Sequence, residues 1–391
     1  MTRFLTYLFG RLPIGWLQLS HNRTRLLAAS AGVAFANLLV FVQLGILGAL
    51  NGTTVAPYAM FDADIMLSST DANTIADGSN IARQRLYEAL STAGVADGIA
   101  IYIANLEWQR DDGTSATLQT FGLAADADAF LAPDIAAKFE PLTLEDTVLM
   151  DSGTRGAPPG ILYNLSPSKP YTFEANARTL SAVGTFTMGG GFAADGALFT
   201  SDQTFLRLFG SRVSGAANHI LLKTQDGIDA EVVVERLRRI LPESSVKVDT
   251  LSNAAAADRR YQTTERPTGI IFGFGVLIGV LVGIVIVYQI LSTDVADHLK
   301  EYATFKAMGY GQPFFLGIVF EEAVILAVFG FIPGLLASLG LYGVLSQATG
   351  LPVDMGLDRA VIVFLGTLLA CVLSGAIATR RLAAADPADL F

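Results

Sequence analysis

Long apolar stretches divide the chain into four parts. Each stretch has few or no charged residues and reaches the ~20 residues that cross the hydrocarbon core of a bilayer. The stretches cover residues 26–50, 268–291, 313–345 and 360–379. The third is long for one straight span, and Pro333-Gly334 in its middle predicts a kink at Pro333. The pattern therefore predicts an α-helical membrane protein with four transmembrane helices.

The segment between the first two spans, residues 51–267, alternates strand-like and helix-like patterns. Strand patterns cover residues 61–69, 98–109, 217–225 and 244–250, and helix patterns cover residues 81–94 and 227–241. The middle is richer in Gly, Pro and short strands. We expect a large extracytoplasmic α+β domain of two lobes inserted between helices 1 and 2. Residues 52–112 and 216–255 would form one α/β lobe, and residues 113–215 an inserted second lobe.

The N-terminal residues 1–25 carry Phe4, Leu5, Leu8 and Leu12 at helical spacing, with arginines among them. This pattern predicts an amphipathic helix in the membrane interface, and the alternative is a disordered basic tail. The first apolar run is longer than the ~7–15 residues of a signal-peptide core, so we expect it to remain as an anchor.

Charged residues beside the spans predict the orientation. Four arginines and no acidic residue precede the first span: Arg3, Arg11, Arg23 and Arg25. Positive residues close to a span end stay in the cytoplasm, and Arg380-Arg381 after the fourth span agree. We expect a multi-pass protein of a bacterial inner membrane with both termini cytoplasmic. Residues 51–267 and the short loop 346–359 would be periplasmic, and the tail 380–391 cytoplasmic.

The outer segment carries the acidity of the chain. Of the 391 residues, 52% are hydrophobic and 16% charged, and the net charge is −10. Residues 52–267 hold 17 of the 26 Lys and Arg residues and 27 of the 36 Asp and Glu residues. Such an acidic surface argues against binding of nucleic acid. Cys371 is the single cysteine and lies in the fourth span, so we expect no disulfide in the outer domain.

The charged segment 292–312, between the second and third spans, has the pattern of an amphipathic helix. Ser292, Thr293 and Asp294 would cap its start and Gly309 would end it, with Lys306 near the negative end. Its apolar stripe is Val295, Leu299 and Tyr302, and its opposite side is Asp297, Lys300, Glu301 and Thr304. Because it has three acids and two lysines, anionic lipid would attract it poorly. We expect it to dock into a groove of a partner protein.

Small and acidic residues mark two further places in the spans. Gly275, Gly279 and Gly283 form a stripe of small residues, either for packing inside the bundle or for a dimer contact. Gly330 and Gly334 are a weaker copy. Glu321 and Glu322 lie near the start of the third span, where we expect them to be wet at the interface rather than buried.

The sequence has no motif for catalysis or for binding of a cofactor. It contains no GxxxxGK[ST] phosphate loop, and none of its six lysines follows a glycine. The three histidines, His21, His219 and His298, are far apart, and His219 reads as a residue at the edge of the core. The run TMGGG at 187–191 reads as a turn.

Several stretches resemble DevC-type ABC transporter permeases of the MacB and FtsX group. They are TDVADHLKEYATFKAMGY in the segment after the second span, PIGWLQLSHNRTRLLAASAGVAFANLLVFVQLG at the start, GTFTMGGGFAADGALFTSDQTFLRLF in the outer domain and RRLAAADPADLF at the end. The similarity spans nearly the whole chain in the expected order.

The resemblance implies a non-catalytic permease that acts as a homodimer with a separate ABC ATPase subunit. This partner would bind ATP and Mg²⁺, and this chain no cofactor or metal. The helix 292–312 would couple to the ATPase: Val295, Leu299 and Tyr302 would seat in its groove, and Asp294, His298, Lys300 and Glu301 would set the register at the rim.

The resemblance also implies efflux of a lipid or other amphiphile through a periplasmic adaptor (a membrane fusion protein) and a TolC-like outer-membrane channel. Two alternatives stay open at this point. One is an FtsX-like signalling subunit that activates a cell-wall hydrolase, and the other is LolC- or LolE-like lipoprotein release.

Overall fold

The computed structural model describes residues 13–110, 113–157, 160, 162 and 165–384. The chain forms two compact units. One contains the spanning helices, and the other contains residues 49–269 together with 349–352. We refer to them as the membrane unit and the outer domain.

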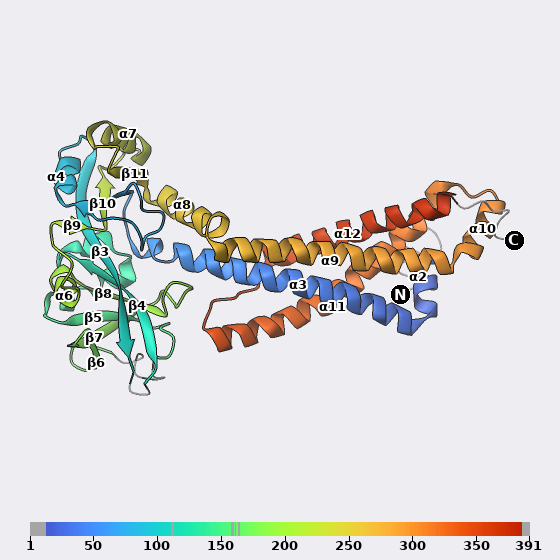
Figure 1. The fold of residues 1–391 in the computed structure, drawn as a ribbon, viewed down its shortest axis with the longest axis horizontal. Helices are drawn as coiled ribbons and strands as arrows, with labels where there is room; N and C mark the ends of the chain where they lie inside the picture. The colour runs from blue at the N-terminus through green and yellow to red at the C-terminus, as the bar shows by residue number, and fades with distance from the viewer. Residues whose placement is uncertain (1–12, 111–112, 158–159, 161, 163–164, 385–391) are drawn as a thin grey trace. The chain divides into compact units, whose positions relative to one another are not determined.

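Six helices of the described residues build the membrane unit (Figure 1). They are α2 (Ile14–His21), α3 (Arg23–Val55), α9 (Pro267–Asp297), α10 (Leu299–Ala307), α11 (Gln312–Thr349) and α12 (Leu357–Ala384). Among the described residues, α3, α9, α11 and α12 are long and apolar enough to cross a membrane. The four predicted spans are present, and each helix extends beyond its apolar run.

Polar residues continue these helices because they can bond within them. At the end of α3, the Thr54 hydroxyl donates to the Leu50 carbonyl, 2.8 Å away, in the same helix. Pro333 lies inside α11. The helix α11 is continuous from Gln312 to Thr349, so Pro333 does not divide the span, and the kink at Pro333 stays a prediction. Residues 1–12, with most of the predicted interfacial helix, lie outside the described residues, and α2 covers its final part.

The outer domain is built on one nine-stranded sheet with the order β11-β1-β10-β3-β4-β8-β5-β7-β6. The first group of strands is β1 (Ile65–Ser69), β3 (Val95–Gln109), β10 (His219–Thr224) and β11 (Val246–Thr250). The second group is β4 (Ser115–Leu123), β5 (Thr147–Asp151), β6 (Tyr171–Ala175), β7 (Arg178–Phe186) and β8 (Gly196–Ser201). A separate pair joins β2 (Ile81–Ala82) to β9 (Ala216–Ala217).

Short helices complete the outer domain. They are η1 (Tyr58–Met60), α4 (Gln84–Leu90), η2 (Ala127–Phe130), α5 (Pro133–Ala136), η3 (Glu140–Thr143), α6 (Asp202–Leu208), α7 (Ala230–Ile240) and α8 (Leu251–Thr264). The helix α7 is amphipathic, and its apolar side packs against β11 with Val233, Val234 and Leu237 buried. The Asp229 side chain caps its start by accepting from the Glu231 amide.

The sequence-distant flanks form a split β-α-β arrangement. The strand β10 lies between β1 and β3 and is antiparallel to both, while β1 lies between β10 and β11. The two units β1-α4-β3 and β10-α7-β11 are therefore interleaved, as in ferredoxin-like folds. Every strand and helix predicted in the flanks is present.

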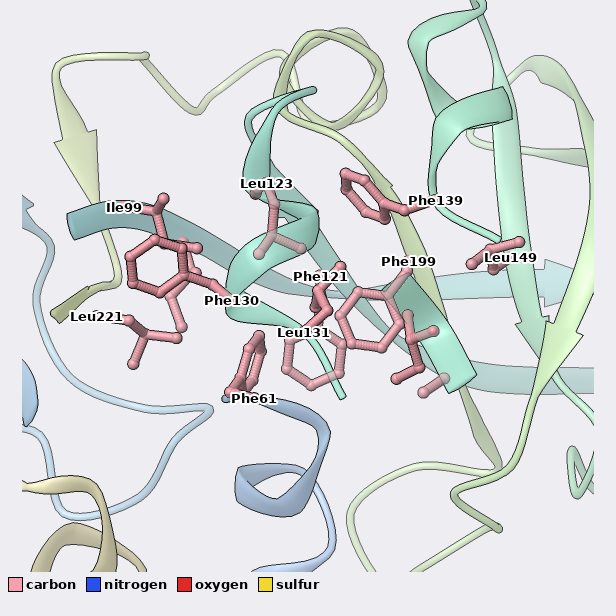
Figure 2. Packing of buried hydrophobic residues seen from close by; sticks show 14 of the residues in the cluster. Phe61, Ile99, Phe121, Leu123, Phe130, Leu131, Phe139, Leu149, Phe199 and Leu221 are labelled. Carbon is pink, nitrogen blue, oxygen red and sulfur yellow. The ribbon is translucent and has the colours of Figure 1, made fainter. Parts of the chain in front are cut away.

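The inserted part shares a strand and a core with the flanks. The first half of β3 pairs with β10 and the second half with β4, and the single bridge between Trp108 and Ala175 joins β3 to β6. One buried cluster contains Ile99 and Leu221 from the flanks together with Phe121 and Phe199 from the insertion (Figure 2). The two predicted lobes are thus parts of one sheet with a common core.

Candidate functional site

Arg25, in the first turn of α3, holds the end of α9 by two ion pairs. Its Nη2 lies 2.9 Å from Asp294 Oδ1, and its Nη1 lies 2.8 Å from Asp297 Oδ2. The side chain of Asp294 is 3% exposed and that of Asp297 is 58% exposed. Water screens an exposed pair, whereas a buried carboxylate depends on its partner. The contact between Arg25 and Asp294 is therefore the one that fastens α3 to α9.

The helix α2 reaches α10 through Gln18. Gln18 Nε2 donates to Glu301 Oε2 over 3.1 Å, and the Tyr302 hydroxyl donates to Gln18 Oε1 over 3.4 Å. Tyr302 is wholly buried and meets Phe315 of α11 edge-on, with ring centroids 5.7 Å apart. One side chain of α2 thus contacts two consecutive residues of α10.

Glu321 and Glu322 of α11 are buried. Both are 0% exposed, and the Trp16 amide donates to Glu321 Oε1 over 3.1 Å. The helix α2 covers them closely, since a Cβ on Gly15 would lie 2.9 Å from Glu322 Cγ. The expectation that these carboxylates are wet is therefore wrong. Their burial follows from α2 packing on α11, a contact between segments about 300 residues apart that no local pattern reveals.

The predicted start of the coupling helix is also wrong. The helix α9 continues through Ser292, Thr293 and Asp294, and α10 begins at Leu299 after a break at His298. The Thr293 hydroxyl donates to the Gln289 carbonyl within α9. Because the backbone N–H groups of these residues are bonded inside the spanning helix, they need no cap. Asp294 instead pairs with the arginine of α3.

The apolar stripe of the predicted coupling helix faces the bundle. Val295 is 2% exposed and Tyr302 0% exposed, and Leu299 packs against the same cluster, which includes Leu19 of α2 and Ile318 of α11. The sequence therefore identified the apolar face correctly. The idea that this face seats in a partner is contradicted, since α2 and α11 already cover it.

The other predicted coupling residues lie around this contact. Asp297, Glu301 and Thr304 are exposed, and Lys306 is half-buried. His298 sits at the break with its Nδ1 3.0 Å from the Asp294 carbonyl oxygen. Lys300 lies within α10, and its side chain is outside the described part of the structure.

The end of α10 agrees with the prediction at Gly309. This glycine has φ +93°, its amide bonds to the Lys306 carbonyl, and the Tyr310 amide bonds to the Phe305 carbonyl. These two bonds form a Schellman motif, and the rings of Phe305 and Tyr310 pack across it with centroids 5.8 Å apart. The motif fixes the turn from α10 toward α11 and leaves Met308 60% exposed.

The glycine stripe of α9 packs against α3. A Cβ on Gly275 would meet Gln43, one on Gly279 would meet Val40, and one on Gly283 would lie 3.2 Å from the Ala36 Cβ. Of the two open interpretations, this contact favours packing inside the bundle, because the small residues let two helix backbones approach closely.

In the outer domain, Asp151 organises the TMGGG run as a turn. Its Oδ1 accepts from the Gly153 and Met188 amides, and its Oδ2 accepts from the Gly189 amide, each over 2.9 Å. Gly189 has φ +90°, a conformation that other residues rarely adopt. Asp151 is fully buried, and burial raises its pKa, against the opposing effect of the three amides.

Arg155 ties this turn to the loop 349–352, which belongs to the outer domain. Its guanidinium donates to the carbonyls of Gly191, Ala194 and Thr349, the last over 2.9 Å. Its Nε also lies 3.1 Å from Asp195 Oδ1. One side chain thus joins two loops that are about 150 residues apart in sequence.

Two buried titratable residues hold the backbone of Ile75. Asp258 Oδ2 accepts from the Ile75 amide over 3.0 Å and from the Tyr58 hydroxyl over 2.9 Å. His219 has Nε2 2.9 Å from the Ile75 carbonyl oxygen and Nδ1 2.8 Å from Ser68 Oγ. Burial raises the pKa of Asp258 to about 6 and lowers that of His219 to about 4. The histidine is thus a neutral residue that is buried within the core rather than at its edge.

Metal ligands do not cluster in the part of the chain that the structure describes, where no group of three His, Cys, Asp or Glu residues is placed to hold a metal ion. Cys371 is buried in α12. Sequence analysis did not predict the contact between Arg25 of α3 and Asp294 of α9. The sequence signal for this contact was a basic residue just before the first span, Arg25, and an acidic residue just after the second span, Asp294.

Together, the fold and the site define a multi-pass membrane protein with a large α/β domain between its first two spans. Residues 273–387 match the family model of the FtsX-like permease C-terminal domain, so this part of the chain is similar to FtsX-like permeases. Over these residues the predicted resemblance to FtsX-like permeases is confirmed. The match covers the last three spans and the segment with α10.

Two solved structures resemble part of the chain distantly. The extracellular domain of the noncanonic ABC-type transporter YknZ from Gram-positive bacteria has 10% identity and a TM-score of 0.33, covering 48% of this chain and 98% of that one. The periplasmic region of MacB from Actinobacillus actinomycetemcomitans has 12% identity and a TM-score of 0.34, covering 50% of this chain and 92% of that one. No curated protein matches the chain.

Proposed function

We propose that this chain is the permease subunit of an ABC exporter in a bacterial inner membrane, with both termini cytoplasmic. A separate ATPase subunit binds ATP and Mg²⁺ and docks at the end of the membrane unit that carries α10. The chain performs no catalysis and passes the movement of the ATPase to its own outer domain. The FtsX-like domain and the sequence resemblance to DevC-type permeases support this role.

The observation that carries the proposal is the pair of Arg25 and Asp294. It joins α3 and α9, and both helices continue by sequence into the outer domain, as α11 also does at Thr349. The helix α3 is followed by η1, and α9 is preceded by α8. A force applied near α10 would therefore act on α3 and α9 together.

The docking surface for the ATPase is the exposed side of α10, together with the last residue of α9 and the turn that follows α10. It contains Asp297, Glu301, Thr304, Met308 and Tyr310, and the last two are 60% and 46% exposed. An exposed methionine and tyrosine inside a polar rim are typical of a protein interface. This surface replaces the buried stripe that the sequence had suggested.

The cargo follows from the sequence resemblance. We propose a lipid or other amphiphile, exported by a homodimer of this chain through a periplasmic adaptor and a TolC-like channel. Activation of a cell-wall hydrolase and release of lipoproteins are the other outcomes of the test.

The test is affinity purification of the full chain from membranes of cells that express it, followed by identification of bound proteins. We expect an ABC ATPase and an adaptor, whereas a hydrolase or a lipoprotein carrier would favour the alternatives. Thr304→Arg should abolish binding of the ATPase. Thr264→Arg, at an exposed threonine in the last turn of α8, is the matched control and should retain it. Binding retained in Thr304→Arg would exclude the proposed surface.

A further inference from the structure

An apolar cavity of about 230 Å³ lies in the membrane unit between α3, α9 and α12. Small residues are part of its lining, among them Gly279 and Gly283 of α9 and Gly366 of α12. Val280 and Ile362 lie on its rim and are 41% and 63% exposed. The cavity is larger than the ~150 Å³ apolar cavity that suffices to bind benzene in a soluble protein. Its size and lining suit part of a hydrocarbon chain.

Asn37 of α3 places a polar group in this lining. Its side chain is 4% exposed, and Asn37 Oδ1 accepts from the Thr367 hydroxyl over 2.5 Å, while Nδ2 has no hydrogen-bond partner. The Thr367 hydroxyl also lies 2.7 Å from the Val363 carbonyl oxygen, and it has a single proton for both acceptors. If the amide is turned round, Nδ2 donates to Thr367 and one of its two protons is still unused. In either orientation Asn37 keeps a free N–H donor.

Neither water nor a phospholipid headgroup fits this donor well. A buried water typically makes about three hydrogen bonds, whereas the lining side chains offer two polar groups, those of Asn37 and Thr367. Asn37 is 11 residues from Leu26, the start of the apolar run of α3, which is about 17 Å at 1.5 Å per residue. It therefore lies near the middle of a hydrocarbon core ~30 Å thick, whereas phospholipid ester carbonyls lie at its edges.

We propose that this cavity is a binding site for a single-chain amphiphile with an oxygen atom in the middle of its hydrocarbon chain. The hydrocarbon chain of the amphiphile lies between α9 and α12, and the hydroxyl or keto oxygen on it accepts a hydrogen bond from the Asn37 amide. Burial of the chain against Val280 and Ile362 removes it from the surrounding lipid, and the hydrogen bond selects the oxygenated chain over a plain one. Binding of the amphiphile can be tested without the ATPase. A negative result would therefore leave the proposed coupling role untouched, and loss of the coupling role would leave this binding site untouched.

The experiment uses the full chain in phosphatidylcholine nanodiscs and photolabelling with octadecanoic acid that carries a diazirine in its chain. Labelled peptides from α9 and α12 are quantified while either 12-oxo-octadecanoic acid or octadecanoic acid competes. We expect the keto acid to displace the label at about fivefold lower concentration, the typical worth of one hydrogen bond. In Asn37→Leu the two acids should compete equally.

A second variant tests the cavity itself. A Cβ on Gly366 meets no atom within 4 Å, so Gly366→Leu should fold and fill the cavity, reducing labelling at least fivefold. Gly340 of α11 has the same open surroundings and does not line the cavity, so Gly340→Leu is the matched control and should label normally. Equal competition by the two acids on the unmodified chain would overturn the proposal, as would labelling unaffected by Gly366→Leu.

Discussion

Arg25 Nη2 lies 2.9 Å from Asp294 Oδ1, and this pair joins the start of the first span to the end of the second. Arg25 also reaches Asp297, whose side chain is mostly exposed. The two aspartates therefore provide an internal comparison of a buried and an exposed ion pair made by one arginine.

Loss of the buried pair should destabilise the membrane unit. Arg25→Ala leaves the Asp294 carboxylate buried without its cation, which we expect to cost roughly 2–4 kcal/mol, toward the lower end because Arg25 is partly exposed. The measurement is thermal unfolding of the full chain in detergent. Asp297→Ala is the control and should cost under ~1 kcal/mol. Equal losses in the two variants would show that burial of Asp294 is unimportant.

Acidification should change the stability of the outer domain in opposite directions through Asp258 and His219. The folded pKa of Asp258 is about 6, above its ordinary 3.8, so the folded state binds the proton more tightly and gains stability as the pH falls from 7 to 4. The folded pKa of His219 is about 4, below its ordinary 6.5, so the folded state loses stability over the same range. Each effect amounts to roughly 3 kcal/mol.

The two effects can be separated by substitution. In Asp258→Asn the outer domain should lose stability on acidification, and in His219→Gln it should gain stability. The measurement is denaturant unfolding followed by the fluorescence of Trp108, in the background Trp16→Phe so that one tryptophan reports. A pH response of the same sign in both variants would contradict the assignment.

Removal of Arg155 should loosen two loops together. Arg155→Ala leaves the carbonyls of Gly191, Ala194 and Thr349 without this donor. We expect faster hydrogen exchange in peptides covering 187–195 and 349–352, with peptides of β3 unchanged. Exchange that rises in the first loop alone would mean that Arg155 does not connect them.

Close contact between α3 and α11 makes Gly334 intolerant of a side chain. A Cβ there would lie 2.9 Å from the Ala34 carbonyl oxygen and 3.0 Å from Asn37 Cβ, so Gly334→Ala should cost about 1–3 kcal/mol. Gly343 lies further along α11 with no atom within 4 Å of its Cβ position, so Gly343→Ala should cost little. Thermal unfolding of the two variants in detergent makes the comparison, and a milder effect at Gly334 than at Gly343 would refute it.

Local pattern predicted the spans and the flanking strands and helices of the outer domain well. A helix that spans a bilayer requires about 20 apolar residues in a row. The helix α7 has apolar residues at helical spacing, so its buried side can be recognised in the sequence. The helix ends were less predictable, because Thr54 and Thr293 continue a helix beyond its apolar run by bonding to its own carbonyls.

Contacts between distant segments could not be predicted in this way. The apolar face of α10 was identified, but its cover by Leu19 and Phe315 depends on how α2 and α11 fold back on it. The same holds for the burial of Glu321 and Glu322. A partner groove and an intramolecular groove impose the same pattern on a helix, so the sequence alone could not choose between them.

The proposed passage of ATP-driven movement through the Arg25–Asp294 pair to the outer domain can be measured in the proposed complex of two copies of the chain with the ATPase. The quantity is the distance between spin labels on the two copies of the outer domain. A label at Tyr87→Cys, an exposed position on α4, in the background Cys371→Ser serves this purpose. We expect ATP and Mg²⁺ to shift this distance, and Arg25→Ala to abolish the shift while the ATPase stays bound. A shift that persists in Arg25→Ala, or no shift in the unsubstituted complex, would show that the pair does not transmit the movement.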